Sequence, residues 1–189
     1  MHFIARKPIP ERLWPPLAAG ALMLVIGIVA YVTRQPFLYP SLGPTAFLQA
    51  EYPYHRTSRF RDTTLGHIIG IISGLASVFI LGAQSVPQIG AGNQLSALRI
   101  GAAALAVTLV IFLQLLITVS NPPSAGTALL FALGFFQPRL LDVVEVLAGV
   151  LFMATFGVLI RHFRLKSATT TTGGQAATDV QSPTNELTT

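Results

Sequence analysis

The chain has 189 residues, of which 52% are hydrophobic and only 10% are charged. A typical soluble domain carries about 25% charged residues, and a small soluble chain has too much surface to hide so many apolar side chains. The composition therefore excludes a soluble globular protein and indicates an integral membrane protein. The net charge of +5 does not indicate nucleic-acid binding, because the basic residues flank apolar segments, where they act as topology signals and lipid-headgroup contacts.

Four long apolar segments predict four membrane-spanning helices. They run from about Trp14 to Thr33, from Thr63 to Ala83, from Ala97 to Val119 and from Leu141 to Ile160. Each contains roughly the 20 residues that a helix needs to cross the hydrocarbon core. The first segment is too long for a signal-peptide core and lacks an A-x-A cleavage site, so we expect it to remain as an uncleaved span.

Two shorter segments lie between the long ones, from Pro40 to Ala50 and from Pro122 to Phe136. As helices they reach roughly 15 and 22 Å, which is less than the core thickness of about 30 Å. Both begin with proline and serine and continue into glycine and a Thr-Ala pair, in Ser41 to Ala46 and in Ser124 to Ala128. The alternative to a repeat is chance, because proline and small residues are frequent in membrane helices.

The order long, short, long occurs twice and predicts the fold class. We expect an all-α membrane protein with four long helices, two short proline-initiated helices and an inverted repeat of three segments each. The halves cover about residues 14–84 and 97–160 of a membrane domain that spans residues 14–165. Residues 1–13 form a basic N-terminus. The tail, residues 166–189, is rich in Thr, Ser, Gly and Ala and is expected to be disordered.

Three groups of basic residues constrain the topology. They are Arg6, Lys7 and Arg12; Arg56, Arg59 and Arg61; and Arg161, Arg164 and Lys166. If the short segments cross, six crossings place all three groups in the cytoplasm and leave the uncharged loop 85–96 outside, as the positive-inside rule requires. If the short segments are re-entrant, four crossings remain and the second group lies outside. We favour six segments with both termini cytoplasmic.

The starts of the two short segments predict a small polar site. A helix N-terminus attracts anions because its first amides and its dipole present positive charge, and Pro40-Ser41 and Asn121-Pro122 are suited to capping. In inverted-repeat transporters, interrupted helices meet the substrate near the bilayer midplane. The candidate substrate-binding residues are Ser41, Gly43, Thr45, Asn121, Ser124, Gly126 and Thr127. The alternative is that these residues only allow close helix packing.

The second and third long segments carry further polar and small residues. Gly66, Gly70 and Gly74 form a ridge that predicts close packing, either within the chain or in a homo-oligomer. His67 is a candidate for substrate binding or proton linkage, because an ionisable residue inside a membrane is a functional candidate by default. An interfacial role near Asp62 is the alternative for His67. Gln114 is expected to link helices through hydrogen bonds.

The sequence contains no pattern for catalysis or for a cofactor. It has no nucleophile with a base and an orienting group, no HExxH motif and no phosphate-binding loop. It has no cysteine, and a lone histidine is not a metal site. We therefore expect no enzymatic activity, no cofactor and no metal. Asp142 and Glu145 are interpreted as charges that complement a helix start.

The stretch Asn121-Pro122-Pro123-Ser124-Ala125-Gly126-Thr127-Ala128, together with Ser41 to Leu48, resembles the HPP family of small membrane proteins. The resemblance covers roughly residues 10–165. The family is named for a His-Pro-Pro motif and is usually described with four spanning helices. Some members from chloroplasts and cyanobacteria are nitrite transporters, so the resemblance implies nitrite transport across a bacterial or cyanobacterial inner membrane or a chloroplast-type membrane. Asn121 stands where the motif has histidine, which implies a difference in pH dependence or substrate.

Three functions remain open at this point. The first is a passive or ion-coupled transporter of a small anion, with nitrite implied by the resemblance. The second is a channel or transporter for another small solute, and the third is a membrane scaffold or assembly factor without a pore. Polar residues from both short helices facing one cavity would favour transport, whereas a dry apolar interior would favour the scaffold. The expected partners are the lipid bilayer and a small anion, with no nucleic acid.

Overall fold

The computed structural model describes residues 12–89 and 94–179, with side chains of the last helix described as far as His162. Six α-helices follow one another in this part of the chain, and two single 3-10 turns, Arg56–Ser58 and Ala83–Ser85, lie beside the third. The α-helices are α1 (Trp14–Thr33), α2 (Leu42–Glu51), α3 (Phe60–Leu81), α4 (Ala97–Leu116), α5 (Pro123–Ala132) and α6 (Leu140–Asp179). The prediction of an all-α protein with four long and two short helices is confirmed.

Four helices are long and apolar enough to cross a membrane: Trp14–Thr33, Phe60–Leu81, Ala97–Leu116 and, within α6, Leu140–His162. The short helices α2 and α5 have 10 residues each, so each extends about 15 Å, half of a hydrocarbon core. The second short helix is shorter than the predicted Pro122–Phe136, because the chain turns at Gly134, where φ is 87°. Only glycine adopts that backbone conformation readily.

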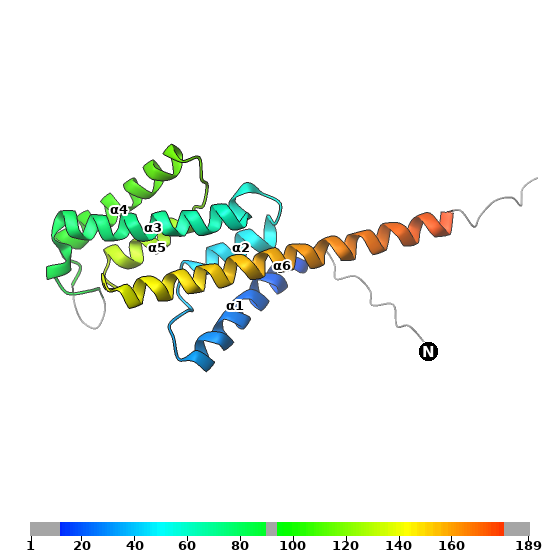
Figure 1. The fold of residues 1–189 in the computed structure, drawn as a ribbon, viewed down its shortest axis with the longest axis horizontal. Helices are drawn as coiled ribbons and strands as arrows, with labels where there is room; N and C mark the ends of the chain where they lie inside the picture. The colour runs from blue at the N-terminus through cyan, green and yellow to red at the C-terminus, as the bar shows by residue number, and fades with distance from the viewer. Residues whose placement is uncertain (1–11, 90–93, 180–189) are drawn as a thin grey trace, which may run out of the picture.

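The long helices α3 and α6 lie along the length of the molecule and run in opposite directions (Figure 1). The tilted α1 lies beside α6, the tilted α4 lies beside α3, and the short helices α2 and α5 lie between these pairs. The start of α1, the end of α2 and the start of α3 lie toward the same end as the last membrane-spanning turns of α6 (Figure 1). We call this the basic end, because Arg12, Arg56, Arg59, Arg61 and Arg161 belong to these segments.

The chain therefore returns to the basic end after α2, as the six-segment interpretation requires. A contact between α2 and α6 supports this placement, because the Gln49 side chain lies against the backbone of Gly157, one turn before Arg161. The opposite end contains the end of α3 and the starts of α4 and α6 (Figure 1). We call it the far end.

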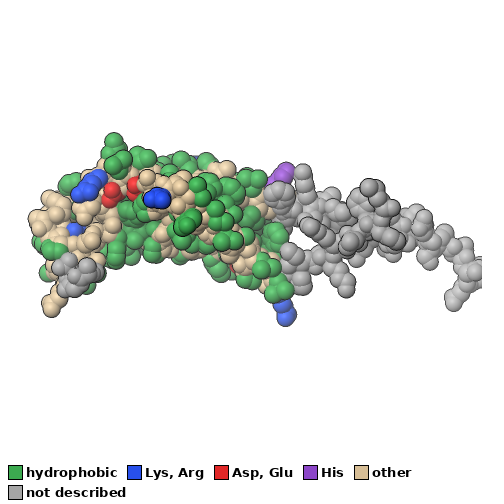
Figure 2. Space-filling view, turned by 90° about the horizontal axis from the view of Figure 1, so that it is seen from below, with side chains coloured by type: hydrophobic (Ala, Val, Ile, Leu, Met, Phe, Trp, Pro, Cys, Tyr) green, Lys and Arg blue, Asp and Glu red, His purple; other side chains and the backbone are tan. Residues whose placement is uncertain are grey.

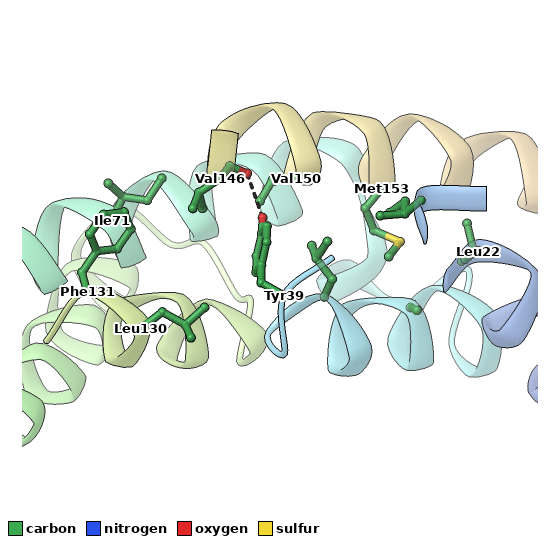
Figure 3. Close-up of a cluster of buried hydrophobic side chains, with 11 residues drawn as sticks. Leu22, Tyr39, Ile71, Leu130, Phe131, Val146, Val150 and Met153 are labelled. Atoms are coloured by element: carbon green, nitrogen blue, oxygen red, sulfur yellow. Dashed lines mark hydrogen bonds between the residues drawn. The ribbon is translucent and has the colours of Figure 1, made fainter. Parts of the chain in front are cut away.

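An apolar core joins α1, α2 and α6 to residues of α3 and α5 (Figure 3). Leu22 of α1 and Met153 of α6 are almost completely buried in it. Tyr39, just before α2, points its hydroxyl toward α6 and donates a 2.7 Å hydrogen bond to the carbonyl oxygen of Val146. This bond satisfies a phenol that would otherwise be costly to bury and fixes the chain where it enters the short helix.

A second apolar cluster joins α3, α4 and α5 and consists mostly of alanine. Ala102 and Ala106 of α4 and Ala128 and Ala132 of α5 are each completely buried. Side chains this small allow helix backbones to approach closely, which is the usual basis of helix association in a membrane.

The glycine ridge of α3 packs against α5 of the same chain. A methyl group at Gly70 would stand 2.5 Å from the carbonyl oxygen of Ser124, and one at Gly74 would stand 2.6 Å from that of Ala128. A methyl group at Gly66 would meet the side chain of Asn121. The prediction of close packing is confirmed. Of the two alternatives for this ridge, packing within the chain is the one observed, because α5 covers it.

Large apolar side chains cover much of the outer surface (Figure 2). Tyr31, Ile80 and Leu115 are 85%, 67% and 73% exposed, which suits side chains that face lipid rather than water. At the C-terminal end, the backbone of α6 is helical to Asp179 and so differs from the disorder predicted for residues 166–179. An existing helix is extended at low cost because each added residue gains a hydrogen bond. Residues 1–11 and 180–189 lie outside the described residues, as does the tip of the 85–96 loop.

Candidate functional site

His67 lies at the centre of a buried polar cluster formed by α2, α3 and α5. Its side chain has no exposed surface. Nε2 is 3.1 Å from Oγ1 of Thr45 on α2, and Nδ1 is 2.7 Å from Oγ1 of Thr127 on α5. Each ring nitrogen is therefore hydrogen-bonded to one threonine, and the two threonines come from different short helices. His67 therefore faces neighbouring helices rather than lipid or water.

Ser41 completes the cluster from the start of α2. Its hydroxyl is 2.8 Å from Oγ1 of Thr127, and its carbonyl oxygen accepts a 3.1 Å hydrogen bond from Thr45. We use the name His67 cluster for Ser41, Thr45, His67 and Thr127. All four are at most 4% exposed, and a buried polar cluster of this kind is stable only when its groups are paired.

One arrangement of protons satisfies the whole His67 cluster. Thr45 donates to the Ser41 carbonyl, so its oxygen is free to accept from Nε2–H of His67. Nδ1 then accepts from the Thr127 hydroxyl, and the Ser41 hydroxyl donates to Thr127. When His67 gains a proton, Nδ1–H becomes a donor to Thr127, Thr127 donates to Ser41 instead, and the Ser41 hydroxyl is free to donate a hydrogen bond to a new acceptor. The direction of hydrogen-bond donation between Ser41, Thr127 and His67 therefore reverses when His67 becomes charged.

The expected side-chain caps at the short helices are absent. Neither Ser41 nor Pro122, the N-cap residues of α2 and α5, makes a side-chain cap hydrogen bond. Backbone bonds engage the first amides instead, from Leu42 to Tyr39 and from Ser124 to Asn121. An anion at this place would therefore be held by hydroxyl and imidazole groups rather than by free helix-terminal amides, although the helix dipoles still point their positive ends at it.

A second polar network lies between α3, α4 and α5, one to two turns toward the basic end of α3. Gln114 of α4 accepts a 2.8 Å hydrogen bond from the backbone amide of Asn121 and donates to Oγ of Ser124. The Asn121 amide group donates to the carbonyl oxygens of Thr63 at 3.1 Å and Asp62 at 3.4 Å. Asp62 also accepts from the amide of Ser120 at 3.2 Å and pairs with Arg56 at 3.4 Å. We call this the Asn121 network.

The predicted site residues thus fall into three groups. Ser41, Thr45, His67 and Thr127 meet in one cluster. Asn121 and Ser124 belong to the Asn121 network, so Asn121 joins α5 to α3 rather than touching His67. Gly126 lies where α2 and α5 cross, because a methyl group there would stand 3.0 Å from Cβ of Ser41, and Gly43 faces open space.

Gln49 was not predicted, although it extends the polar face of α2. It lies one turn after Thr45, is 2% exposed, and neither atom of its amide has a hydrogen-bond partner. Spacing could have revealed it, because Ser41, Thr45 and Gln49 recur every four residues and so share one helix face. Its neighbour Gly157, 108 positions away in the chain, has no sequence signal.

An apolar groove of about 560 Å³ runs along the outside of α2 and α5, and Ser41 contributes to its wall. Its other walls are prolines, leucines and phenylalanines of the two short helices, among them Pro44, Phe47, Pro123 and Leu129. Ser41, itself buried, therefore lies between the His67 cluster and this groove.

These features define a polytopic membrane protein in which two short helices, α2 and α5, enclose a histidine of α3. The chain belongs to the HPP family: the family model described as "HPP, transmembrane region" matches residues 4–169. No curated protein and no solved structure matches the chain. The family assignment from the Asn-Pro-Pro stretch is confirmed.

Proposed function

We propose that the protein transports a small monovalent anion, such as nitrite, through the His67 cluster. The observation that supports this most is the position of His67, which is completely buried between one threonine from each short helix. Ionisable groups in the interior of a membrane protein are costly and commonly mark an ion pathway. The two short helices start beside this histidine, an arrangement used in transporters whose halves alternate in access.

The two halves of the chain contribute equivalent residues to the cluster. Thr45 follows Ser41 and Gly43 in the first half, and Thr127 follows Ser124 and Gly126 in the second. The two threonines hold opposite nitrogens of His67, which supports the inverted repeat. We infer that rocking of one half relative to the other would open the cluster first to one side and then to the other, with the basic end in the cytoplasm.

Charge balance indicates that a proton accompanies the anion. The His67 cluster contains no permanent cation, and an unpaired anion is very costly in a medium of low dielectric constant. Protonation of His67 would supply the missing positive charge. It would also free the Ser41 hydroxyl to donate a hydrogen bond to a new acceptor, and an anion is such an acceptor. We therefore propose electroneutral transport of one anion with one proton.

Nitrite uptake into proteoliposomes tests this proposal. We expect wild-type protein to take up nitrite faster than protein-free vesicles, to respond to an imposed pH gradient and to be insensitive to a potassium-valinomycin potential. The Thr45→Val/Thr127→Val variant, which keeps the shape of both side chains, should lose this uptake. Uptake equal to that of empty vesicles would instead support a membrane scaffold, and a potential-driven uptake would contradict electroneutral transport. Competition by chloride, nitrate and formate would define which small anion is preferred.

A further inference from the structure

The apolar groove along α2 and α5 lies on the outside of the molecule, where a membrane protein meets lipid. The two short helices touch near their starts, where Ser41 bonds to Thr127 and a methyl group at Gly126 would stand 3.0 Å from Cβ of Ser41. Beside this crossing they leave the groove of about 560 Å³. In a bilayer such a space is filled, because an empty groove would forfeit the dispersion contacts of its walls.

The groove has the length and the chemistry of a path for one acyl chain. Its α2 wall, from Pro40 to Leu48, extends about 12 Å, and one leaflet of the hydrocarbon core is roughly 15 Å deep. This wall runs toward the basic end, where α2 ends at Glu51. A hydrocarbon tail that enters from the basic end can therefore lie along the groove against apolar side chains of both short helices.

Aromatic side chains continue the groove toward the basic end. Phe47 lines the groove and is 54% exposed. Its ring packs edge-on against Tyr52, with 6.2 Å between the ring centroids, and both Tyr52 and Tyr54 are half exposed or more. Tyrosines are enriched where the hydrocarbon core meets the lipid headgroups. The groove therefore opens at the level of the headgroups.

A basic turn is attached to the groove wall at this opening. The Ser58 hydroxyl donates a 2.9 Å hydrogen bond to the carbonyl oxygen of Leu48, whose side chain lines the groove. Arg59 directly follows Ser58, and Arg59 and Arg61 are both exposed. The hydrogen bond therefore holds a pair of arginines beside the end of the groove that faces the headgroups.

The positive charge of these two arginines is not neutralised within the described residues. The one ion pair there joins Arg56 to Asp62. Glu51, which ends α2, is exposed and pairs with neither Arg59 nor Arg61. Each arginine near a membrane surface raises the affinity for anionic lipid by about fivefold. The opening of the groove is therefore suited to a negatively charged headgroup.

We propose that this groove binds one anionic phospholipid, with an acyl chain along Phe47 and Leu129. Its headgroup would lie at Arg59 and Arg61. A second copy of the chain fits less well, because an interface that uses the same patch on both subunits would bring the two basic turns together. The proposal is independent of nitrite transport, because it concerns the lipid-facing side of the short helices.

Non-denaturing mass spectrometry of the purified full-length protein in detergent tests the site with three lipids. We expect one palmitoyl-oleoyl phosphatidylglycerol to bind per chain. Phosphatidylcholine with the same acyl chains should bind about tenfold more weakly, because it lacks the net negative charge. Phosphatidylglycerol with hexanoyl chains keeps the headgroup and should also bind at least about tenfold more weakly, because most of the tail contact is lost.

The headgroup contact is tested by the Arg59→Gln/Arg61→Gln variant. It should weaken phosphatidylglycerol binding by roughly twentyfold, the product of two arginine contributions, and leave phosphatidylcholine binding unchanged. The matched control is Arg34→Gln/Arg139→Gln, which removes two exposed arginines toward the far end and should bind both lipids as the wild type does.

The tail contact is tested by Leu129→Trp, which fills the groove. It should weaken phosphatidylglycerol binding by about tenfold or more, because excluding even two methylene groups from apolar contact has an effect of this size. Leu24→Trp, at a 64% exposed position of α1 outside the groove, is the control. If Leu129→Trp does not fold, the exposed Phe47→Ala should still weaken binding severalfold, whereas Phe79→Ala, 57% exposed on α3, should not.

Three outcomes would overturn the proposal. The first is equal binding of the two headgroups, and the second is phosphatidylglycerol binding that neither Leu129→Trp nor Phe47→Ala weakens. The third is a dimer that dissociates in either groove variant while lipid binding stays the same, which would assign the groove to a second copy of the chain.

Discussion

The His67 cluster and the Asn121 network lie against the same helix, α3, but they are built differently. In the Asn121 network, side chains mostly bond to the backbone, as when Asn121 donates to Thr63 and Gln114 accepts from the Asn121 amide. In the His67 cluster, the ring bonds only to hydroxyl groups of other side chains. Bonds to backbone fix helices in place. Hydroxyl groups can rotate and exchange partners, so the difference separates a structural clamp from a group that can respond to a proton or a ligand.

The largest effect is expected from a substitution that disrupts the packing of α3 against α5, on which both regions depend. Gly70→Ala would place a methyl group 2.5 Å from the Ser124 carbonyl and should destabilise the protein by about 3 kcal/mol, because α3 and α5 must separate. The midpoint of thermal unfolding in detergent measures this. Gly20→Ala is the matched control, because a methyl group at Gly20 meets nothing within 4 Å. Equal stability in both variants would contradict the close approach of α3 and α5.

A smaller effect is expected from disrupting the Asn121 network. Gln114→Leu leaves the Asn121 amide and the Ser124 hydroxyl without their partner on α4, and we expect a loss of about 2 kcal/mol in the free energy of unfolding. Thr108→Val on the same helix is the control, because Thr108 is exposed and bonds only within its own helix. Chemical unfolding of both variants would measure the difference, and an unchanged stability of Gln114→Leu would show that the network is not a clamp.

The proposed equivalence of the two halves predicts that Thr45 and Thr127 have similar effects. Thr45→Val and Thr127→Val each remove one partner of His67, and each should slow nitrite uptake by about tenfold, or about 1.4 kcal/mol in the barrier. Initial uptake rates at equal amounts of folded protein measure this. A strong effect at Thr127 with none at Thr45 would argue against the equivalence of the two short helices.

The smallest effect is expected at Ser41, whose hydroxyl is linked to His67 only through Thr127. Ser41→Ala removes the end of the hydroxyl chain and should slow uptake by about threefold, or about 0.7 kcal/mol. The measurement is uptake across a series of external pH values, where the defect should depend on pH. A reduction that is the same at every pH would indicate a packing effect.

The sequence predicted the helices well because the bilayer imposes a length and an apolar composition that can be counted. α1 agrees with its predicted range, Trp14–Thr33, residue for residue. Thr45 and Thr127 were predicted to line one polar site and His67 was a separate candidate. Their direct contacts could not be predicted, since they join residues 22 and 60 positions apart. The glycine ridge signalled close packing, but small residues carry no information on which helix fills the space.

Arg99 and Gln49 show why part of the polar interior was missed. An arginine near a predicted helix start resembles any interfacial charge, and its burial depends on the turn at Gly134 and on the carbonyls of Ala132 and Val86. A glutamine in a short helix resembles any linking residue until its environment is known. Sequence periodicity identifies which residues share a face, whereas the partners of that face come from the tertiary structure.

The most direct test of the central claim compares one variant from each region in the same assay. His67→Gln and Gln114→Leu are reconstituted side by side, and nitrite uptake is measured per folded protein with internal pH recorded at the same time. We predict that His67→Gln loses nitrite uptake and the accompanying acidification, while Gln114→Leu keeps both. Retention of uptake and acidification by His67→Gln would contradict the assignment of the His67 cluster as the transport site.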